Sequence, residues 1–352
     1  MTIQANIPLA AFTTIGLGGT ARFFAACNSD ADLREALSHA RREHLRVHIL
    51  GGGSNTIFAD EGFSGLVLSM AMTGVEFTDR GTHVLVRAAA GEPWDRIVEA
   101  SIDRGLSGLE CLSGIPGLVG ATPMQNVGAY GQEVADTILS VEAVDRSSLQ
   151  SVTFSKAECR FGYRTSRFKQ EDSDRFVITG VAFSLATHAR PSLRYPELQR
   201  AVDRTVNFNT MESGRPALTA VRDAVLRLRR SKSMVVDPAD PNTRSVGSFF
   251  TNPVVPPATF HAIEDRWKAG GSPIPHFPAG SSVKIPAGWL VERAGYPKGF
   301  QKGRVGVSLH HALALVNHGG TTAELLTLAG EIEDAVYLRF GIRLEREPVI
   351  VQ

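Results

Sequence analysis

The chain has 352 residues, which exceeds the usual size of one hydrophobic core and therefore predicts two or three domains. It contains 37 lysine and arginine residues against 36 aspartate and glutamate residues, so its formal net charge of +1 provides no field that would attract nucleic acid or an anionic membrane. The three cysteines, Cys27, Cys111 and Cys159, are too widely spaced for a disulfide framework or paired zinc ligands. The first residues lack an export signal, and no apolar run could span a bilayer. We therefore expect a cytoplasmic protein without nucleic-acid or membrane partners.

The first part of the chain alternates helix and strand patterns. Apolar residues recur with helical spacing over 30–42, and short apolar runs at 46–50 and 65–70 are typical of strands. The middle part predicts a strand at 84–88, a helix at 93–104, a glycine-rich stretch over 106–131, strands at 141–144 and 176–183, and a polar linker at 205–216.

The last part begins with an amphipathic helix over 217–230. Loops rich in proline, glycine or polar residues follow at 237–243 and 270–280, then a closing helix over 323–340 and a strand over 342–351. On such a strand the carboxylates of Glu345 and Glu347 would point to one face. We see no internal repeat.

Two glycine-rich segments could hold a ligand. Gly51, Gly52, Gly53, Ser54 and Asn55 directly follow a predicted strand, where backbone amides suit a diphosphate, although a simple turn is the commoner meaning of such a pattern. The segment is neither a P-loop nor a dinucleotide-binding fingerprint. The stretch 113–131 contains five glycines that could wrap around a flat cofactor, or could form a loop that only packs against a helix.

Ser248 follows Gly247 and precedes two phenylalanines, which predicts a confined and largely dry hydroxyl. Alone, it would more often be a strand serine whose hydroxyl bonds to the backbone. A serine hydrolase is a poor interpretation despite His310 and His311, because the chain lacks the Gly-x-Ser-x-Gly turn. No second histidine pair supports a zinc site.

Eight segments in order resemble the UDP-N-acetylenolpyruvoylglucosamine reductase family, also called UDP-N-acetylmuramate dehydrogenases. The resemblance spans nearly the whole chain. It is carried by Phe12–Gly19, Leu50–Asn55, Ile115–Gly131, Gly162–Arg164, Gly247–Pro253, Ala287–Leu290, His311–Asn317 and Leu344–Glu347.

The resemblance implies an α+β chain, with a two-domain FAD-binding fold of the vanillyl-alcohol oxidase (PCMH) type and a C-terminal α+β substrate-binding domain. We expect FAD-binding subdomains over 1–72 and 73–215 and the substrate-binding domain over 216–352. It implies FAD contacts by Gly51, Gly52, Gly53, Ser54, Asn55, Ser113, Gly114, Gly117, Gly120, Ala121, Thr122, Gln125, Asn126, Gly128, Ala129 and Tyr130.

The family reaction implies that NADPH, the co-substrate, reduces FAD, which then reduces the enolpyruvyl ether of UDP-N-acetylglucosamine enolpyruvate. Hydride reaches the terminal carbon, and charge builds on the neighbouring carbon and in the carboxylate. By motif match, Arg164 and Glu347 hold that carboxylate and Ser248 protonates the carbon. No metal is implied.

The resemblance also implies substrate-binding residues. Tyr195 matches a tyrosine on a loop over the substrate in the longer type of this family, and Lys232 and Asn252 match residues at the UDP-sugar. Tyr163, Lys284 and Gln301 are further matches, although the segment 301–304 is more basic than is usual in the family. We expect a monomer.

Two other functions would fit a protein of this type. One is a sugar or alcohol oxidase of the same fold, which would need a base rather than a proton donor at the substrate carbon. The other is a UDP-sugar binding protein that has lost its flavin, which would be colourless when purified.

Overall fold

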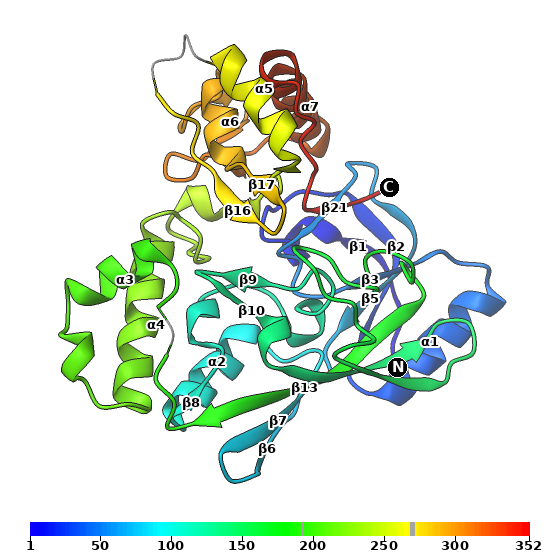
Figure 1. Cartoon of the computed structure of the whole chain (residues 1–352). Coiled ribbons are helices and arrows are strands. Elements are labelled where there is room, and N and C mark those ends of the chain that lie inside the picture. Colours follow the sequence, from blue (N-terminus) through cyan, green and yellow to red (C-terminus); the bar gives the residue numbers. More distant parts are fainter. Residues whose placement is uncertain (192, 268–271) are drawn as a thin grey trace. The chain divides into compact units, whose positions relative to one another are not determined.

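The computed structural model describes residues 1–191, 193–267 and 272–352 (Figure 1). Residues 270 and 271 of the predicted loop 270–280 therefore lie outside the described residues. Contacts divide the chain into two compact units with interleaved segments. Unit 1 comprises Met1–Ile7, Ala21–Gly52 and Ser64–Val235, and unit 2 comprises Pro8–Thr20, Gly53–Phe63 and Val236–Gln352. Both contain helices and strands, so the predicted α+β class is confirmed.

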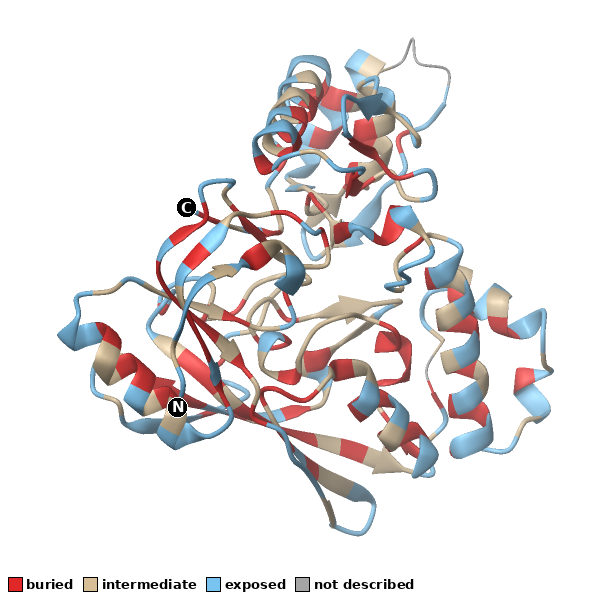
Figure 2. Cartoon of the chain, turned by 180° about the vertical axis from the view of Figure 1, so that it is seen from behind, coloured by how far each residue is buried: buried red, intermediate tan, exposed pale blue. Residues whose placement is uncertain are grey.

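One sheet of unit 1 has the strand order β1-β2-β5-β3. Its members are β1 (Gln4–Pro8), β2 (Thr20–Cys27), β3 (Val47–Leu50) and β5 (Phe63–Met70). Ser29 caps helix α1 (Asp30–Arg42), because its hydroxyl accepts a hydrogen bond from the Asp32 amide. The helix buries its apolar stripe (Figure 2), which packs in a cluster with Leu66 and Leu68 of β5. The helix and strands predicted here are confirmed.

The larger sheet of unit 1 has the order β12-β11-β13-β7-β6, with β8 beside β13. Its strands are β6 (Val75–Asp79), β7 (His83–Ala89), β8 (Leu106–Ser107), β11 (Ile138–Asp145), β12 (Ser151–Ser155) and β13 (Phe176–Thr187). Helix α2 (Trp94–Asp103) buries Trp94, Ile97 and Val98 in the same core as Val86, Val141 and Phe183. A short hairpin consists of β9 (Gly128–Ala129) and β10 (Gln132–Glu133).

Two helices complete unit 1. Helix α3 (Pro196–Asp203), which the sequence analysis did not predict, packs its Leu198 and Val202 with Val221 and Val225 of α4 (Arg215–Arg230). The division predicted at residue 216 places α4 with the third domain, whereas the contacts place it in unit 1 because its apolar face is covered by α3 and by the turn Glu110–Leu112.

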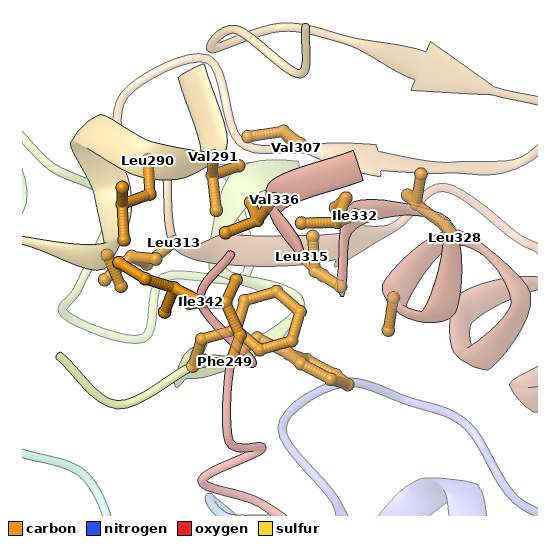
Figure 3. Packing of buried hydrophobic residues seen from close by; sticks show 14 of the residues in the cluster. Phe249, Leu290, Val291, Val307, Leu313, Leu315, Leu328, Ile332, Val336 and Ile342 are labelled. Atoms are coloured by element: carbon orange, nitrogen blue, oxygen red, sulfur yellow. The ribbon is translucent and has the colours of Figure 1, made fainter. Parts of the chain in front are cut away.

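Unit 2 contains a sheet of order β14-β20-β19-β18 and a smaller sheet of order β15-β17-β16. The strands of these two sheets are β14 (Ser245–Ser248), β15 (Val254–Val255), β16 (Phe277–Ala279), β17 (Ser282–Lys284), β18 (Gln301–Lys302), β19 (Val305–Val307) and β20 (Ala314–Asn317). Its helices are α5 (Pro257–Trp267), α6 (Ala287–Arg293) and α7 (Thr322–Phe340). Side chains of α6, α7 and the larger sheet meet in one core around Phe249 (Figure 3).

Two short N-terminal segments belong to unit 2 because hydrogen bonds tie them there. The Asp60 carboxylate accepts from the amides of Thr322 (2.8 Å) and Ala323 (2.9 Å) at the beginning of α7. The Asn317 side chain donates to the carbonyl of Ile15 (2.9 Å). The interleaving of the chain is thus stabilised by contacts that no local pattern reveals.

The predicted strand over 342–351 is wrong for most of its length. Only β21 (Val349–Val351) is a strand, and it pairs in parallel with β4 (Thr56–Phe58). Before it, Arg346 makes an isolated bridge to Phe250. Pro348, which has no N–H, lies where the pairing partner of the chain changes from Phe250 to β4. His310 and His311 lie between β19 and β20.

Within the described residues, no helix is long and apolar enough to cross a membrane. The same part of the chain holds no cluster of three or more histidine, cysteine or acidic side chains that could bind a metal ion.

Candidate active site

The first glycine segment presents backbone amides at the end of β3. The amides of Gly51 and Gly52 donate no hydrogen bond to any described residue, and neither does the amide of Gly117 in the second segment. A Cβ atom on Gly52 would lie 2.8 Å from the Cα of Gly117, so the two backbones touch where only glycine fits. Amide donors without partners among the described residues, on two adjoining backbones, suit a diphosphate, and this part of unit 1 therefore fits FAD.

Gly53, Ser54 and Asn55 continue this segment in unit 2. A Cβ atom on Gly53 would lie 1.9 Å from the Phe12 carbonyl oxygen, and the Gly53 carbonyl accepts a hydrogen bond from the Thr14 amide (3.1 Å). The Asn55 side chain donates to the carbonyl of Glu347 (3.2 Å). The positions of Gly53 and Asn55 are therefore determined by packing within unit 2.

Several side chains in the second glycine segment are used within the protein. The hydroxyls of Ser113 and Thr122 donate to the carbonyls three residues before them. The Asn126 amide, which is 1 % exposed, donates to the Glu133 carboxylate (2.7 Å) and the Gly162 carbonyl (3.0 Å). A packing role thus explains these three side chains, and their predicted FAD contacts stay predictions.

Asp95 of α2 fixes the beginning of this segment. Its carboxylate accepts from the Gly114 amide (2.6 Å) and, through both oxygens, from the guanidinium of Arg222 in α4 (2.7 and 2.8 Å). Burial alone would raise the pKa of Asp95, but these hydrogen bonds outweigh it and hold the pKa below the ordinary value of 3.8.

Three non-glycine residues near the β9–β10 hairpin have left-handed backbone conformations, which are uncommon and concentrate at functional sites. They are Asn126 (φ 48°), Tyr130 (φ 50°) and Arg164 (φ 53°). The Arg164 guanidinium donates to the carbonyls of Gly128 (2.7 Å) and Asn126 (3.4 Å). These bonds orient a cation beside the predicted flavin-binding loop.

A second polar cluster in unit 1 joins a predicted FAD contact to two predicted substrate contacts. The rings of Tyr130 and Tyr195 meet edge to face, with centroids 5.6 Å apart, and the Lys232 ammonium lies 5.9 Å from the Tyr130 ring centroid. Glu197 in α3, which sequence reasoning missed, pairs with Lys232 at 2.8 Å. Burial raises the pKa of Tyr130 to about 12, so its phenol keeps its proton at neutral pH.

Arg229 is another residue that sequence reasoning missed. It is only 9 % exposed, its Nη2 donates to the Met234 carbonyl (2.6 Å), and its Nε has no hydrogen-bond partner in the described structure. In the sequence, Arg229 precedes the predicted substrate contact Lys232 by three residues. This spacing was only a weak signal that Arg229 belongs to the site, because basic residues are frequent along the whole of α4.

In unit 2 the backbone places Ser248 beside the segment that carries Glu347. Ser248 ends β14 after Gly247, whose φ of 77° favours glycine. The next residue, Phe249, donates its amide to the Leu313 carbonyl (2.8 Å) and accepts at its carbonyl from the Glu347 amide (2.9 Å). The Ser248 side chain is half-buried, and its hydroxyl makes no hydrogen bond to any described residue. The structure thus brings these two predicted catalytic residues together.

The remaining predicted residues divide between the units. The Asn252 side-chain oxygen accepts from the Ala287 amide at the beginning of α6 (2.8 Å), and Lys284 pairs with Val254 across β17 and β15. Gln301 is exposed on β18. Arg164, Tyr163, Tyr195 and Lys232 belong to unit 1, whereas Ser248, Glu347, Asn252, Lys284 and Gln301 belong to unit 2.

Two family models match the chain. Residues 21–149 match an FAD binding domain, and residues 238–351 match the C-terminal domain of UDP-N-acetylenolpyruvoylglucosamine reductase. These matches confirm the FAD-binding fold with a C-terminal domain, and they identify FAD as the cofactor.

Curated relatives match over nearly the whole chain. The UDP-N-acetylenolpyruvoylglucosamine reductase of Thermobifida fusca is 47 % identical over 98 % of this chain and 97 % of its own. That of Mycolicibacterium smegmatis is 46 % identical, over 99 % and 95 %. The fold is similar to the crystal structure of the Thermus caldophilus reductase, with a TM-score of 0.68, 23 % identity and full coverage of both chains. The chain, a flavin-dependent enzyme, therefore belongs to the UDP-N-acetylenolpyruvoylglucosamine reductase family.

Proposed function

We propose that the protein reduces UDP-N-acetylglucosamine enolpyruvate to UDP-N-acetylmuramate, a peptidoglycan precursor, with NADPH as the electron donor. The observation that carries this proposal is the 47 % identity over 98 % of the chain to a reductase named for that substrate. When bound, FAD supplies a hydride, obtained from NADPH, to the terminal carbon of the enolpyruvyl group. The amides of Gly51, Gly52 and Gly117 replace the water that its diphosphate loses.

Ser248 donates the proton to the neighbouring carbon of the enolpyruvyl group. A serine hydroxyl is a weak acid, so it can act only toward a strongly basic carbon and only when it is closely placed. Its support is the geometry of unit 2, where Gly247 and the Phe249 hydrogen bonds fix the backbone and the half-buried hydroxyl has no partner among the described residues. The alkoxide that remains on Ser248 regains its proton from water.

Arg164 and Glu347 act on the substrate carboxylate, where negative charge builds during the reaction. A guanidinium can bind a carboxylate through two parallel N–H donors, and the bonds from Arg164 to the carbonyls of Gly128 and Asn126 orient this one. Glu347, whose amide bonds to the Phe249 carbonyl beside Ser248, helps to hold and polarise the substrate carboxylate.

The remaining assignments concern the UDP-sugar. Lys232 supplies positive charge to the diphosphate, and its pair with Glu197 keeps the ammonium in place until substrate arrives. Asn252, whose side-chain oxygen accepts from the Ala287 amide, contacts the UDP-sugar. Tyr195, at the beginning of α3, covers the substrate. Tyr163, Lys284 and Gln301 make further contacts.

The test is an anaerobic experiment in two steps on the purified protein. NADPH is expected to bleach the flavin absorption near its visible maximum, and UDP-N-acetylglucosamine enolpyruvate is then expected to restore it with formation of UDP-N-acetylmuramate. A flavin that NADPH reduces but that only oxygen reoxidises would contradict the proposal and favour an oxidase. A colourless protein that cannot be loaded with FAD would contradict it in favour of a binding protein.

A further inference from the structure

Strand β3, which carries Gly51 and Gly52 at its end, lies at the edge of its sheet within the described residues. Its only strand neighbour there is β5, with Val47 opposite Leu66. The Arg46 carbonyl accepts from the Leu66 amide (2.8 Å), so it faces β5. Because peptide groups alternate along a strand, the Val47 carbonyl faces the open edge.

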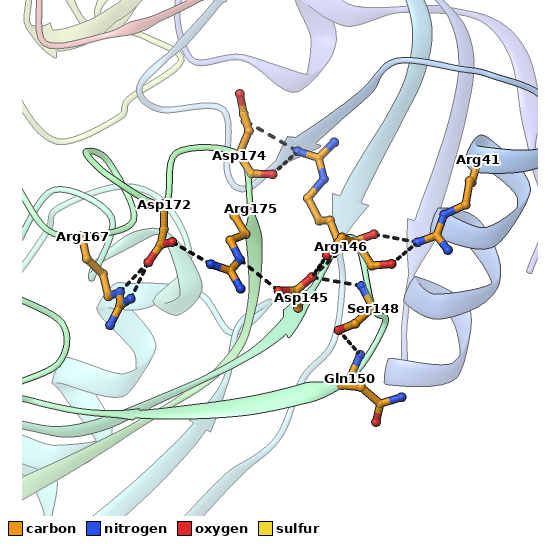
Figure 4. Close-up of polar contacts among 10 residues, drawn as sticks. Arg41, Asp145, Arg146, Ser148, Gln150, Arg167, Asp172, Asp174 and Arg175 are labelled. Atoms are coloured by element: carbon orange, nitrogen blue, oxygen red, sulfur yellow. Dashed lines mark hydrogen bonds and ion pairs between the residues drawn. The ribbon is translucent and has the colours of Figure 1, made fainter.

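Arg146 covers this open edge. It follows β11 directly, and its guanidinium donates to the Val47 carbonyl (3.0 Å). The guanidinium also donates to the Asp174 carbonyl (2.9 Å) (Figure 4). The same guanidinium lies 3.6 Å from the Asp174 carboxylate. One planar side chain thus joins the edge of the first sheet to the segment that enters β13 of the second.

The backbone of Arg146 is held as firmly as its side chain. Its amide donates to the Arg175 carbonyl (2.9 Å), and its carbonyl accepts from the guanidinium of Arg41 in α1 (3.0 Å). The side chain is only 21 % exposed. Burial lowers the pKa of Arg146, and the Asp174 carboxylate opposes this change. A partly buried cation of this kind stabilises a fold weakly but fixes geometry well.

The amides proposed to hold the FAD diphosphate follow Val47 by four and five residues. Strand β3 has four residues and packs Val47 and Ile49 against the core of its sheet. It has one strand neighbour in the described structure, and Arg146 binds its other edge. We infer that Arg146 is a positioning residue for FAD. Arg146 ties β3 to the hairpin β11–β12, and β3 leads directly into the Gly51 and Gly52 amides. The inference rests on the FAD contacts given under the proposed function.

The test compares Arg146→Met with Arg167→Met in the full chain. Arg167 pairs with Asp172 at 2.6 Å in the same polar network (Figure 4). Within the described residues its hydrogen bonds go to Asp172 and to the Glu158 carbonyl rather than to β3. After removal of flavin, FAD is titrated back while its fluorescence quenching is followed, and the thermal unfolding of each apoprotein is measured. We expect Arg146→Met to bind FAD about tenfold more weakly, the effect of losing one charge-assisted hydrogen bond that orders the site, and Arg167→Met to bind it normally.

Arg146→Lys keeps the positive charge but cannot bond to both carbonyls in one plane, so we expect it to restore only part of the affinity. Arg146→Lys is also the variant whose FAD affinity tests the inference if Arg146→Met does not fold. Hydrogen exchange in residues 47–52 of the apoprotein is expected to accelerate in the Arg146 variants alone. Equal FAD affinity of the Arg146 and Arg167 variants, at similar losses of thermal stability, would overturn the inference. The titration requires neither NADPH nor the enolpyruvyl substrate, so failure of the proposed reaction leaves its result unaffected.

Discussion

The predicted site residues of unit 1 and those around Ser248 in unit 2 are held in different ways. In unit 1 the side chains of Arg164 and Lys232 are fixed by carbonyls or by an ion pair. In unit 2 the position of Ser248 is fixed by backbone hydrogen bonds of its neighbour Phe249, while its own hydroxyl makes none to the described residues. Replacing a side chain of unit 1 should therefore change stability and function together, whereas replacing Ser248 should change function without loss of stability.

The largest effect is expected at Ser248, and it tests whether this residue contributes to the reaction but not to stability. Ser248→Ala should slow reoxidation of the reduced flavin by the enolpyruvyl substrate by about 100- to 10,000-fold, the usual contribution of a positioned acid, while the unfolding temperature stays unchanged. Stopped-flow absorbance measures the rate. The control is Ser245→Ala on the same strand, because that buried hydroxyl accepts from the Gly247 amide and should affect stability before rate. A parental rate for Ser248→Ala would refute the assigned role.

Gly52→Ala tests whether backbone approach, rather than a side chain, forms the diphosphate site in unit 1. The added Cβ would lie 2.8 Å from the Gly117 Cα, so the two loops must separate, at a cost of about 1–3 kcal/mol. We expect the purified protein to lose most of its flavin, as measured by the ratio of absorbance at 450 and 280 nm. Gly330→Ala in α7, where the nearest atom is 4.0 Å away, should keep its flavin and gain up to about 1 kcal/mol of stability.

Asp95→Asn tests the coupling of stability and site geometry in unit 1. The variant weakens the bonds to Arg222 and Gly114, and we expect a loss of about 1 kcal/mol at neutral pH because the carboxylate is partly exposed. The pKa of Asp95 is lowered in the folded state, so the stability that the carboxylate contributes is present above pH 4 and lost as the pH falls further. Denaturant unfolding of both proteins from pH 7 to pH 3 should therefore converge at low pH. A constant difference across this range would contradict the prediction.

The smallest effect concerns His48 in β3. Burial lowers its pKa from 6.5 to about 4, with Asp174 raising it and Arg146 lowering it by lesser amounts. The folded protein keeps this imidazole neutral, so stability is complete above pH 6.5 and falls as the pH drops toward 4. Between pH 7.5 and pH 6 we expect a loss of less than about 1 kcal/mol in the parent protein that is absent from His48→Gln. Identical pH profiles of the two proteins would show that His48 does not titrate in this way.

Local patterns were sufficient for most of the secondary structure. The helices over 30–42 and 323–340 and the strands beside them were predictable because apolar periodicity reports which face of an element is buried. Apolar periodicity did not reveal α3, whose eight residues carry only two buried side chains. The predicted last strand also ran through Pro348, because the alternation of residue types does not reveal where a strand changes its pairing partner.

For the site, the sequence by itself determined the residue types: glycines whose amides stay available, a serine in an apolar setting, and the motifs shared with the family. Only the tertiary structure decided that the Glu347 amide bonds to the Phe249 carbonyl beside Ser248, that Glu197 pairs with Lys232, and that Arg146 reaches the edge of β3. Periodicity describes which way a side chain faces within a few turns or strands. Contacts between residues 35 to 99 positions apart depend instead on sheet register and helix packing, which the whole chain decides together.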